Sequence, residues 1–193
     1  TVKIADFGIA RTAQGPKLTE HGGVVGTIDY VSPEYILESI AFLSEAIGYK
    51  GMCLGQSLDI LSENNSINFD QLKEIHEKKT GEFIKACVFT GARLSGATED
   101  QLHALTEYAK HIGLAFQIKD DILDESGTKE ELGKTPGSDK KRKKATYPLL
   151  LGMDKSLAML NEEKDKAINA LKIFGDSAEE LKELAYFIIE RRN

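Results

Sequence analysis

The sequence has no tryptophan, only four prolines and only two cysteines among 193 residues. So few cysteines exclude a disulfide scaffold, and we predict that Cys53 and Cys87 are reduced and buried as small apolar side chains. The scarcity of proline suits helices. No apolar run approaches the roughly 18 residues that cross a bilayer, and no charged-then-apolar signal segment opens the chain. We therefore predict a cytoplasmic protein without a membrane span.

An excess of basic charge is also lacking, since the formal net charge is −6. General nucleic-acid binding depends on neutralising phosphates, so we expect no nucleic-acid partner. The composition that is present, 41% hydrophobic and 29% charged, is globular and excludes a collagen or a disordered tail. The length suffices for one ordinary domain, or for a domain plus a fragment.

The composition changes near residue 35. Residues 1–34 hold five of the seventeen glycines and two of the four prolines, and after a short β-like stretch they are typical of loop and turn. A piece so short cannot bury a core of its own. We therefore assign 1–34 to an irregular segment that is not an independent domain, and 35–193 to a helical domain.

From residue 35 onward, apolar side chains recur at helical spacing. Asp70 is expected to cap the third helix. Thr98 with Gln101 and Ser177 with Glu180 are expected to form capping boxes. The pattern predicts an all-α bundle of antiparallel helices. The expected helices are 35–47, 52–61, 71–94, 98 to a polar loop at about 125–139, 146–151, 153–174 and 178–192.

Three aspartates gather near the end of the fourth predicted helix. Spacings of three and four place Asp124 on the face of Asp120 and Asp121, and Gln117 lies one turn earlier. Like charges at this spacing repel one another, and Mg²⁺ held by carboxylates and substrate phosphates would offset that repulsion. The alternative, a solvated acidic helix end, stays open.

Basic residues follow the aspartates. Lys134 comes after a glycine, and five consecutive basic residues span 140–144. Lysines beside a carboxylate–metal centre suit a polyphosphate ligand. A run of this kind is also typical of a solvated face, so that alternative stays open for each lysine.

Five ordered segments resemble the C-terminal part of a bacterial trans-isoprenyl diphosphate synthase of the farnesyl or geranyl type. The resemblance covers about 36–193, and the ending at 187–192 is similar too. The five segments are 51–60 (GMCLGQSLDI), 76–81 (HEKKTG), 116–124 (FQIKDDILD), 132–134 (LGK) and 144–148 (KATYP).

This resemblance implies an isoprenoid-synthase-like helical bundle around a deep cavity. It also implies prenyl transfer from an allylic diphosphate to isopentenyl diphosphate, with Mg²⁺ as the cofactor that draws off diphosphate. The residues implied to form the second aspartate-rich metal site are Asp120, Asp121 and Asp124. The residues implied to bind the allylic diphosphate are Lys79, Thr80, Gln117, Lys134 and Lys144.

The sequence departs from the family in two ways. Leu54 stands where the family usually has a second glycine before Gln56, so it is expected to crowd the cavity wall near Asp59. The family's first aspartate-rich motif, and the basic residues that hold isopentenyl diphosphate, are not in this sequence. We therefore expect little turnover from the chain alone. We also expect uncovered apolar faces, such as the stripe along 102–116, to favour a homo-oligomer.

Residues 2–11 and 26–34 resemble the activation segment of a bacterial Ser/Thr protein kinase. Asp6 matches the metal-binding aspartate of the Asp-Phe-Gly motif, and 32–34 match the closing motif. Kinase activity is not expected, because the glycine-rich loop, strand lysine and catalytic loop are absent. We interpret the chain as two fragments joined near 34–40. Engineering, recombination and an assembly error all stay open as the origin.

The leading hypothesis is a prenyltransferase of isoprenoid biosynthesis that is weak or inactive alone. One alternative is a non-catalytic helical module that binds Mg²⁺ and diphosphate or a partner chain. Another is a kinase-derived regulatory fragment. We predict Mg²⁺ binding that strengthens when a diphosphate is present.

Overall fold

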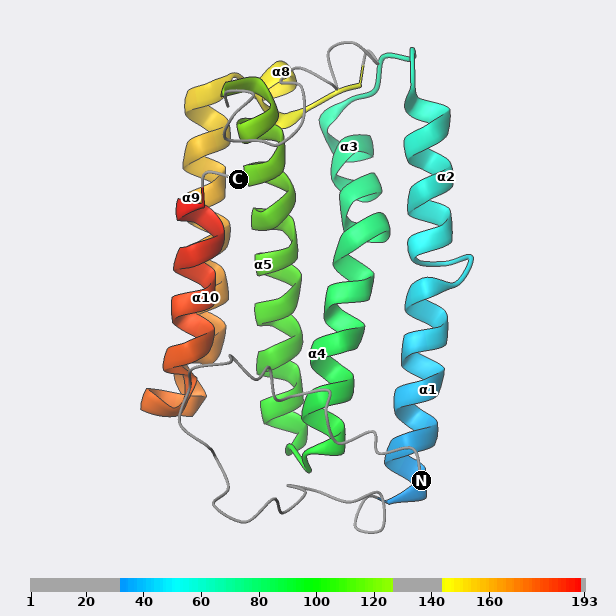
Figure 1. The fold of residues 1–193 in the computed structure, drawn as a ribbon, viewed down its shortest axis with the longest axis vertical. Helices are drawn as coiled ribbons and strands as arrows, with labels where there is room; N and C mark the ends of the chain where they lie inside the picture. The colour runs from blue at the N-terminus through cyan, green and yellow to red at the C-terminus, as the bar shows by residue number, and fades with distance from the viewer. Residues whose placement is uncertain (1–31, 127–143, 192–193) are drawn as a thin grey trace, which may run out of the picture.

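The computed structural model describes residues 32–126 and 144–191, and within these ranges every regular element is a helix. This confirms the predicted all-α fold. The first half of the bundle rises along one edge, returns, and rises again through the middle (Figure 1). Its elements are α1 (Pro33–Ile47), α2 (Met52–Ser62), α3 (Phe69–His76), the π-helical turn η3 (Glu77–Gly81), α4 (Glu82–Leu94) and α5 (Glu99–Ser126).

The second half packs on the other side of α5 (Figure 1). Its elements are α8 (Tyr147–Leu151), α9 (Met153–Ala170), the 3₁₀ segment η4 (Leu171–Ala178) and α10 (Glu179–Glu190). None of the helices in the described ranges is long and apolar enough to cross a membrane.

The core is built around α5, which lies between α4 and α9. Tyr108, Ile112 and Ile118 on α5 are almost fully buried against Leu160 and Ala167 of α9. Burying each such side chain stabilises the fold by about 1.5–3 kcal/mol. The prediction of an uncovered stripe along 102–116 was therefore wrong, because neighbouring helices cover it on both sides.

One of the three predicted helix N-caps is present in the structure, and two are not. Thr98 and Gln101 form the predicted reciprocal box, with side-chain to backbone distances of 2.9 and 3.3 Å. The cap of α3 is Asn68, in a box with Gln71, and not Asp70. α10 begins after Ala178 with no side-chain cap, so the box predicted at Ser177 was wrong. Gly175, at a φ of 57°, breaks the helix just before it.

The first helix starts two residues earlier than predicted. Ser32 is its N-cap, and its hydroxyl accepts a hydrogen bond from the backbone N–H of Glu34 at 3.2 Å. Pro33 occupies the first helical position, where its missing N–H costs nothing. Ser32, Pro33 and Glu34 therefore form the first turn of the bundle. The rest of the segment assigned to a kinase resemblance, including Asp6, lies outside the described residues.

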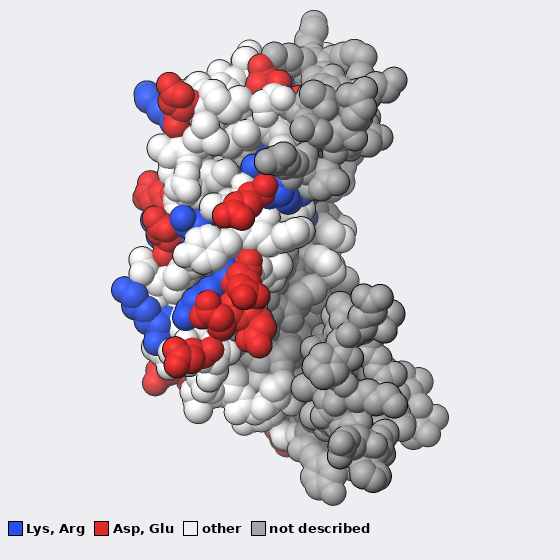
Figure 2. All heavy atoms as spheres, turned by 60° about the vertical axis from the view of Figure 1, so that its left-hand side comes forward, with Lys and Arg blue, Asp and Glu red and all other residues white. Residues whose placement is uncertain are grey.

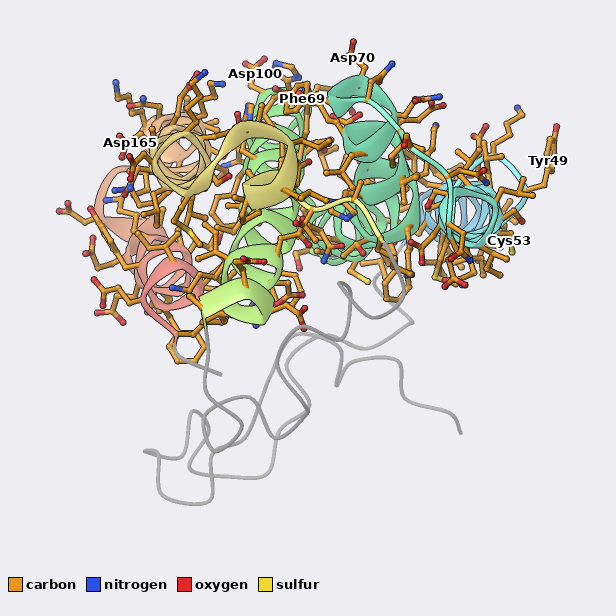
Figure 3. All side chains as sticks on the ribbon, turned by 90° about the horizontal axis from the view of Figure 1, so that it is seen from above. Tyr49, Cys53, Phe69, Asp70, Asp100 and Asp165 are labelled. Carbon is orange, nitrogen blue, oxygen red and sulfur yellow. The ribbon has the colours of Figure 1, made fainter. Side chains whose placement is uncertain are left out.

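Two cysteines, one on α2 and one on α4, are less buried than predicted. Cys53 and Cys87 are free but exposed. Seen along the bundle, Tyr49 and Cys53 lie at its outer edge and point away from the other helices (Figure 3). The edge is outward-facing because α1 packs on α4, and α2 on α3 and η3, while no described helix covers their far side.

The face formed by α9 and α10 carries charges of both signs side by side (Figure 2). Exposed pairs join neighbouring turns there, such as Lys166–Glu162 at 2.8 Å and Lys182–Glu179 at 3.2 Å. Pairs of this kind contribute at most about 0.5 kcal/mol each. This face is therefore a mixed-charge surface.

Candidate functional site

A polar cavity of about 150 Å³ opens where α2, α3, η3 and α5 meet the segment before α8. Apolar side chains from α3 and the loop before it form part of its wall, and charged or amide groups form most of the rest. Its lining residues are Asp59, Ser62, Ile67, Leu72, Ile75, His76, Lys79, Gln117, Asp120, Asp121, Lys144 and Ala145. Five of the eight predicted site residues thus share one cavity, namely Lys79, Gln117, Asp120, Asp121 and Lys144.

Lys79 reaches the cavity from the π-helical turn between α3 and α4. In this turn the N–H of Glu82 bonds to the carbonyl of Glu77, one residue further back than in an α-helix. Turns of this type often occur at functional sites, because they redirect side chains within a continuous helix. Thr80 lies in the same turn but does not line the cavity.

A glycine lets α2 approach this turn closely. A Cβ on Gly55 would lie 2.2 Å from the backbone nitrogen of Lys79 and 2.5 Å from its Cα. Any side chain at this position would therefore force the backbone of α2 or η3 to shift. The neighbouring Leu54 is only partly buried and does not line the cavity. The crowding predicted for Leu54 is therefore not seen at the cavity wall, because the close approach falls on Gly55.

Two lysines meet at a single carboxylate in the cavity. Lys79 Nζ lies 2.7 Å from Asp59 Oδ2, and Lys144 Nζ lies 2.9 and 2.8 Å from the two Asp59 oxygens. Lys144 also faces Glu63 at 3.5 Å. Burial opposes ionisation of Asp59, but hydrogen bonds and charge from Lys144 and Lys79 outweigh it and lower the pKa of Asp59 below its usual range.

His76 stands beside this cluster and is neutral at physiological pH. Burial is the main cause that lowers the pKa of His76 to about 4; the negative charge of Asp59 opposes this shift, and the positive charges of Lys79 and Lys144 add to it. Its ring packs on Tyr147, with centroids 5.4 Å apart. Because it is neutral, His76 adds no positive charge to the lysine pair.

The three aspartates have three different environments. Asp121 is 7% exposed and accepts a hydrogen bond from the backbone N–H of Tyr147 at 2.9 Å. Asp120 has a half-exposed side chain that pairs with Arg191, the residue that follows α10. Asp124 is buried and does not line the cavity. The expected common face therefore divides into two cavity carboxylates and one interior carboxylate.

The oxygen donors of the cavity suit Mg²⁺ only when other ligands complete its shell. No group of three or more His, Cys, Asp or Glu side chains in the described residues is arranged to hold a metal ion by itself. Asp120 and Asp121, with the amide oxygen of Gln117, nevertheless offer oxygen donors on one wall. Mg²⁺ is commonly bound by one or two carboxylates plus substrate phosphates and waters. The residues fit a metal that shares its ligands with a phosphate, and do not fit a closed protein cage.

Two site residues were not predicted from the sequence, and one predicted site residue lies outside the described part of the chain. Asp59 and Arg191 were not predicted as site residues, although both lie in segments that carried the resemblance. Charge alone could have suggested Asp59, since it is the one acidic residue of segment 51–60. Lys134 lies outside the described residues.

Comparison with known proteins identifies the family. The profile of the polyprenyl synthetase family matches residues 20–188. This chain belongs to that family. It is 44% identical over 162 residues to a dimethylallyltranstransferase of Fischerella ambigua, covering 83% of this chain and 47% of the relative. It is 39% identical over 161 residues to a farnesyl diphosphate synthase of Micrococcus luteus, covering 83% and 55%.

Solved structures agree with this assignment. A Helicobacter pylori geranyltransferase, crystallised with magnesium and isoprenyl diphosphate, superposes with a TM-score of 0.68 at 32% identity. The match covers 83% of this chain and 52% of that one. The chain thus spans about half the length of the curated relatives it matches. The family match starts at residue 20, inside the segment assigned to a kinase resemblance, and that resemblance stays a prediction.

Proposed function

We propose that this chain supplies the allylic-diphosphate half of a prenyltransferase site in isoprenoid biosynthesis. The observation that carries the proposal is the meeting of Lys79 and Lys144 in a cavity that Asp120 and Gln117 also line. Cations facing carboxylates across a small polar cavity suit a diphosphate bridged by a divalent metal. The relatives named above, with their prenyl-transfer names, support the same reading.

The cavity's size limits what it holds. At about 150 Å³ it is smaller than the roughly 300–1,000 Å³ typical of small-molecule pockets. It accommodates a diphosphate head group and leaves the hydrocarbon chain outside. Lys79 and Lys144 bind and orient the head group, and Gln117 donates or accepts one hydrogen bond at its side.

Asp120 and Asp121 are the residues that would hold Mg²⁺, while Asp124 supports them from the interior. When bound, the metal supplies positive charge that stabilises a departing diphosphate. Lys79 and Lys144 add fixed positive charge in the same cavity. Lys134 is proposed as a further phosphate contact on the strength of the resemblance alone.

The first experiment is calorimetric titration of the chain with pyrophosphate, with and without Mg²⁺. We expect Lys144→Met to weaken binding about tenfold or more, because it removes a charge-assisted hydrogen bond of about 1.5–3 kcal/mol. Asp120→Asn is expected to abolish the strengthening by Mg²⁺. The matched control is Lys110→Gln, an exposed lysine on α5 that does not line the cavity. Equal heats from wild type and Lys144→Met would contradict the proposal.

The second experiment measures prenyl transfer. The sequence holds one aspartate-rich motif, so we propose that full activity needs a second acidic motif from outside these 193 residues. We expect little transfer between geranyl and isopentenyl diphosphates by the chain alone, and a gain when the N-terminal half of a related synthase is co-expressed. Loss of one electrostatic element costs about 10²–10³ in rate, and a whole metal subsite at least as much. Full turnover by the chain alone would contradict this.

The alternative function is a non-catalytic module that binds Mg²⁺ and diphosphate. The pairing of Asp120 with Arg191 favours it, because that guanidinium competes with a metal for the most exposed carboxylate of the cavity. Binding of pyrophosphate without transfer in any combination of chains would support this alternative. Assembly as a homo-oligomer is part of the proposal, and the cytoplasmic location stays a prediction.

A further inference from the structure

We infer that Asp59 is a positioning residue, which holds the ammonium groups of Lys79 and Lys144 together where they receive a diphosphate. This inference rests on the proposed function. It concerns a negatively charged residue that touches the lysines and not the reacting atoms.

The Asp59 carboxylate contacts both ammonium groups at once, and we call this arrangement the Asp59 clamp. Its carboxylate receives Lys79 at 2.7 Å and Lys144 at 2.9 and 2.8 Å, and its side chain is only 13% exposed. Lys79 comes from η3 and Lys144 from the segment before α8, so no helix joins the two lysines directly. Asp59, on α2, is the group in the described structure that both ammonium groups contact.

Two ammonium groups that contact the same carboxylate repel each other, and the negative charge between them offsets that repulsion. Long lysine side chains also lose rotamer freedom when they are fixed in one place. Asp59 offsets both costs before any ligand arrives. Each ammonium has three donors, and both lysines line the cavity, so the donors that Asp59 does not use are available to a ligand there. A diphosphate then meets two lysines that are already ordered.

If Asp59 only repels the diphosphate and does not position the lysines, removing its charge should have the opposite effect on diphosphate affinity. A carboxylate beside a diphosphate repels it, so neutralising a carboxylate with no positioning role should strengthen binding. The sign of the change therefore separates the two roles. Positioning predicts weaker binding after Asp59→Asn, because a neutral amide no longer offsets the repulsion between the two ammonium groups, and its nitrogen is a donor where the carboxylate had an acceptor.

The test is pyrophosphate titration of Asp59→Asn in two backgrounds. In the wild-type chain we expect binding to weaken about five- to tenfold. In the Lys79→Met, Lys144→Met background there is nothing to position, so Asp59→Asn should leave binding unchanged or strengthen it. The control is Glu63→Gln, which removes a nearby charge that faces Lys144 at 3.5 Å but not Lys79. It should change affinity less than twofold. Stronger binding by Asp59→Asn in the wild-type chain would overturn the inference.

Competitive acetylation followed by mass spectrometry tests the clamp without any ligand. Lys144 has a side chain only 15% exposed, and Lys79 one 35% exposed. If Asp59 holds them, Asp59→Asn should raise the labelling rate of both about threefold or more, with exposed Lys110 as the internal standard.

Unchanged labelling would overturn the inference even if pyrophosphate binds. Absence of pyrophosphate binding to wild type would instead overturn the proposed function, and the labelling would still decide the role of Asp59. Thermal melting shows whether each variant is folded.

Discussion

Asp120 and Asp121 are neighbours in sequence, yet their carboxylates meet different partners. Asp121 turns inward, where it accepts the N–H of Tyr147 and so fixes the start of α8. Asp120 turns outward and meets Arg191 near the end of the chain. Both carboxylates line the cavity, but one residue of offset on a helix rotates a side chain by about 100°, which is enough to give them different partners.

This difference predicts different stabilities for two alanine variants. Asp121→Ala leaves the Tyr147 N–H buried without that acceptor, so we expect it to lower the free energy of unfolding by about 1–3 kcal/mol. Asp120→Ala removes a half-exposed ion pair and should cost at most about 1 kcal/mol. Urea unfolding followed by circular dichroism, without Mg²⁺, measures both. Equal losses in the two variants would show that the burial of Asp121 does not matter.

Among the elements, the π-helical turn decides where Lys79 lies, and α2 packs against it through Gly55. Gly91, within α4, makes a useful contrast. A Cβ there would meet nothing within 4 Å. Gly55 therefore sits where a Cβ would clash with backbone, whereas Gly91 sits where a Cβ would meet open space.

The contrast predicts opposite effects of the same substitution. Gly55→Ala should destabilise the chain by about 1–3 kcal/mol and lower pyrophosphate affinity, because α2 must move away from the Lys79 backbone. Gly91→Ala should stabilise it by roughly 0.5–1 kcal/mol, because alanine restricts the unfolded chain and suits a helix. Melting temperatures give the sign of each change. A stabilising Gly55→Ala would mean that α2 and η3 are not packed as closely as described.

Sequence reasoning succeeded for elements whose signal is local. The box of Thr98 with Gln101 is such a case, since both partners lie within one turn. The cap of α3 was misassigned because Asn68 and Asp70 are both good cap residues, and only Gln71, three positions after Asn68, distinguishes them. The π-helical turn has no local pattern that differs from an α-helix, so the sequence predicted one continuous helix over 71–94.

In the candidate site too, sequence reasoning did not predict a contact between residues that are far apart in the chain. Lys79, Gln117, Asp120 and Lys144 were predicted from motifs, and the cavity brings them together. The role of Asp59 depends on an ion pair with Lys144 that spans 85 positions of sequence. No periodicity or spacing encodes such a pair, because it depends on how α2 and the segment before α8 pack in the folded chain.

At the scale of the whole molecule, the α1–α2 edge exposes several large apolar side chains among the residues that the structure describes. Leu37 and Ile40 on α1 are 67% and 56% exposed, and Ile60 and Leu61 on α2 are 56% and 70% exposed. α1 and α2 follow one another along this edge (Figure 1), so these side chains are distributed along its length. Exposed apolar surface of this kind marks an interface.

We therefore expect the chain to associate with a second copy through this edge, and not through the stripe on α5 that the sequence suggested. Burying apolar surface contributes about 25 cal/mol per Å², so adding charge there should be costly. The variant Leu37→Glu with Ile40→Glu should weaken self-association at least about tenfold, as measured by sedimentation velocity over a concentration series. The matched control is Leu184→Glu with Phe187→Glu on α10, where side chains 45% and 66% exposed lie on a helix already packed against α9 and α5. That control should associate like wild type. A wild-type chain that stays monomeric at every concentration, or equal effects of both pairs of substitutions, would show that the α1–α2 edge does not drive assembly.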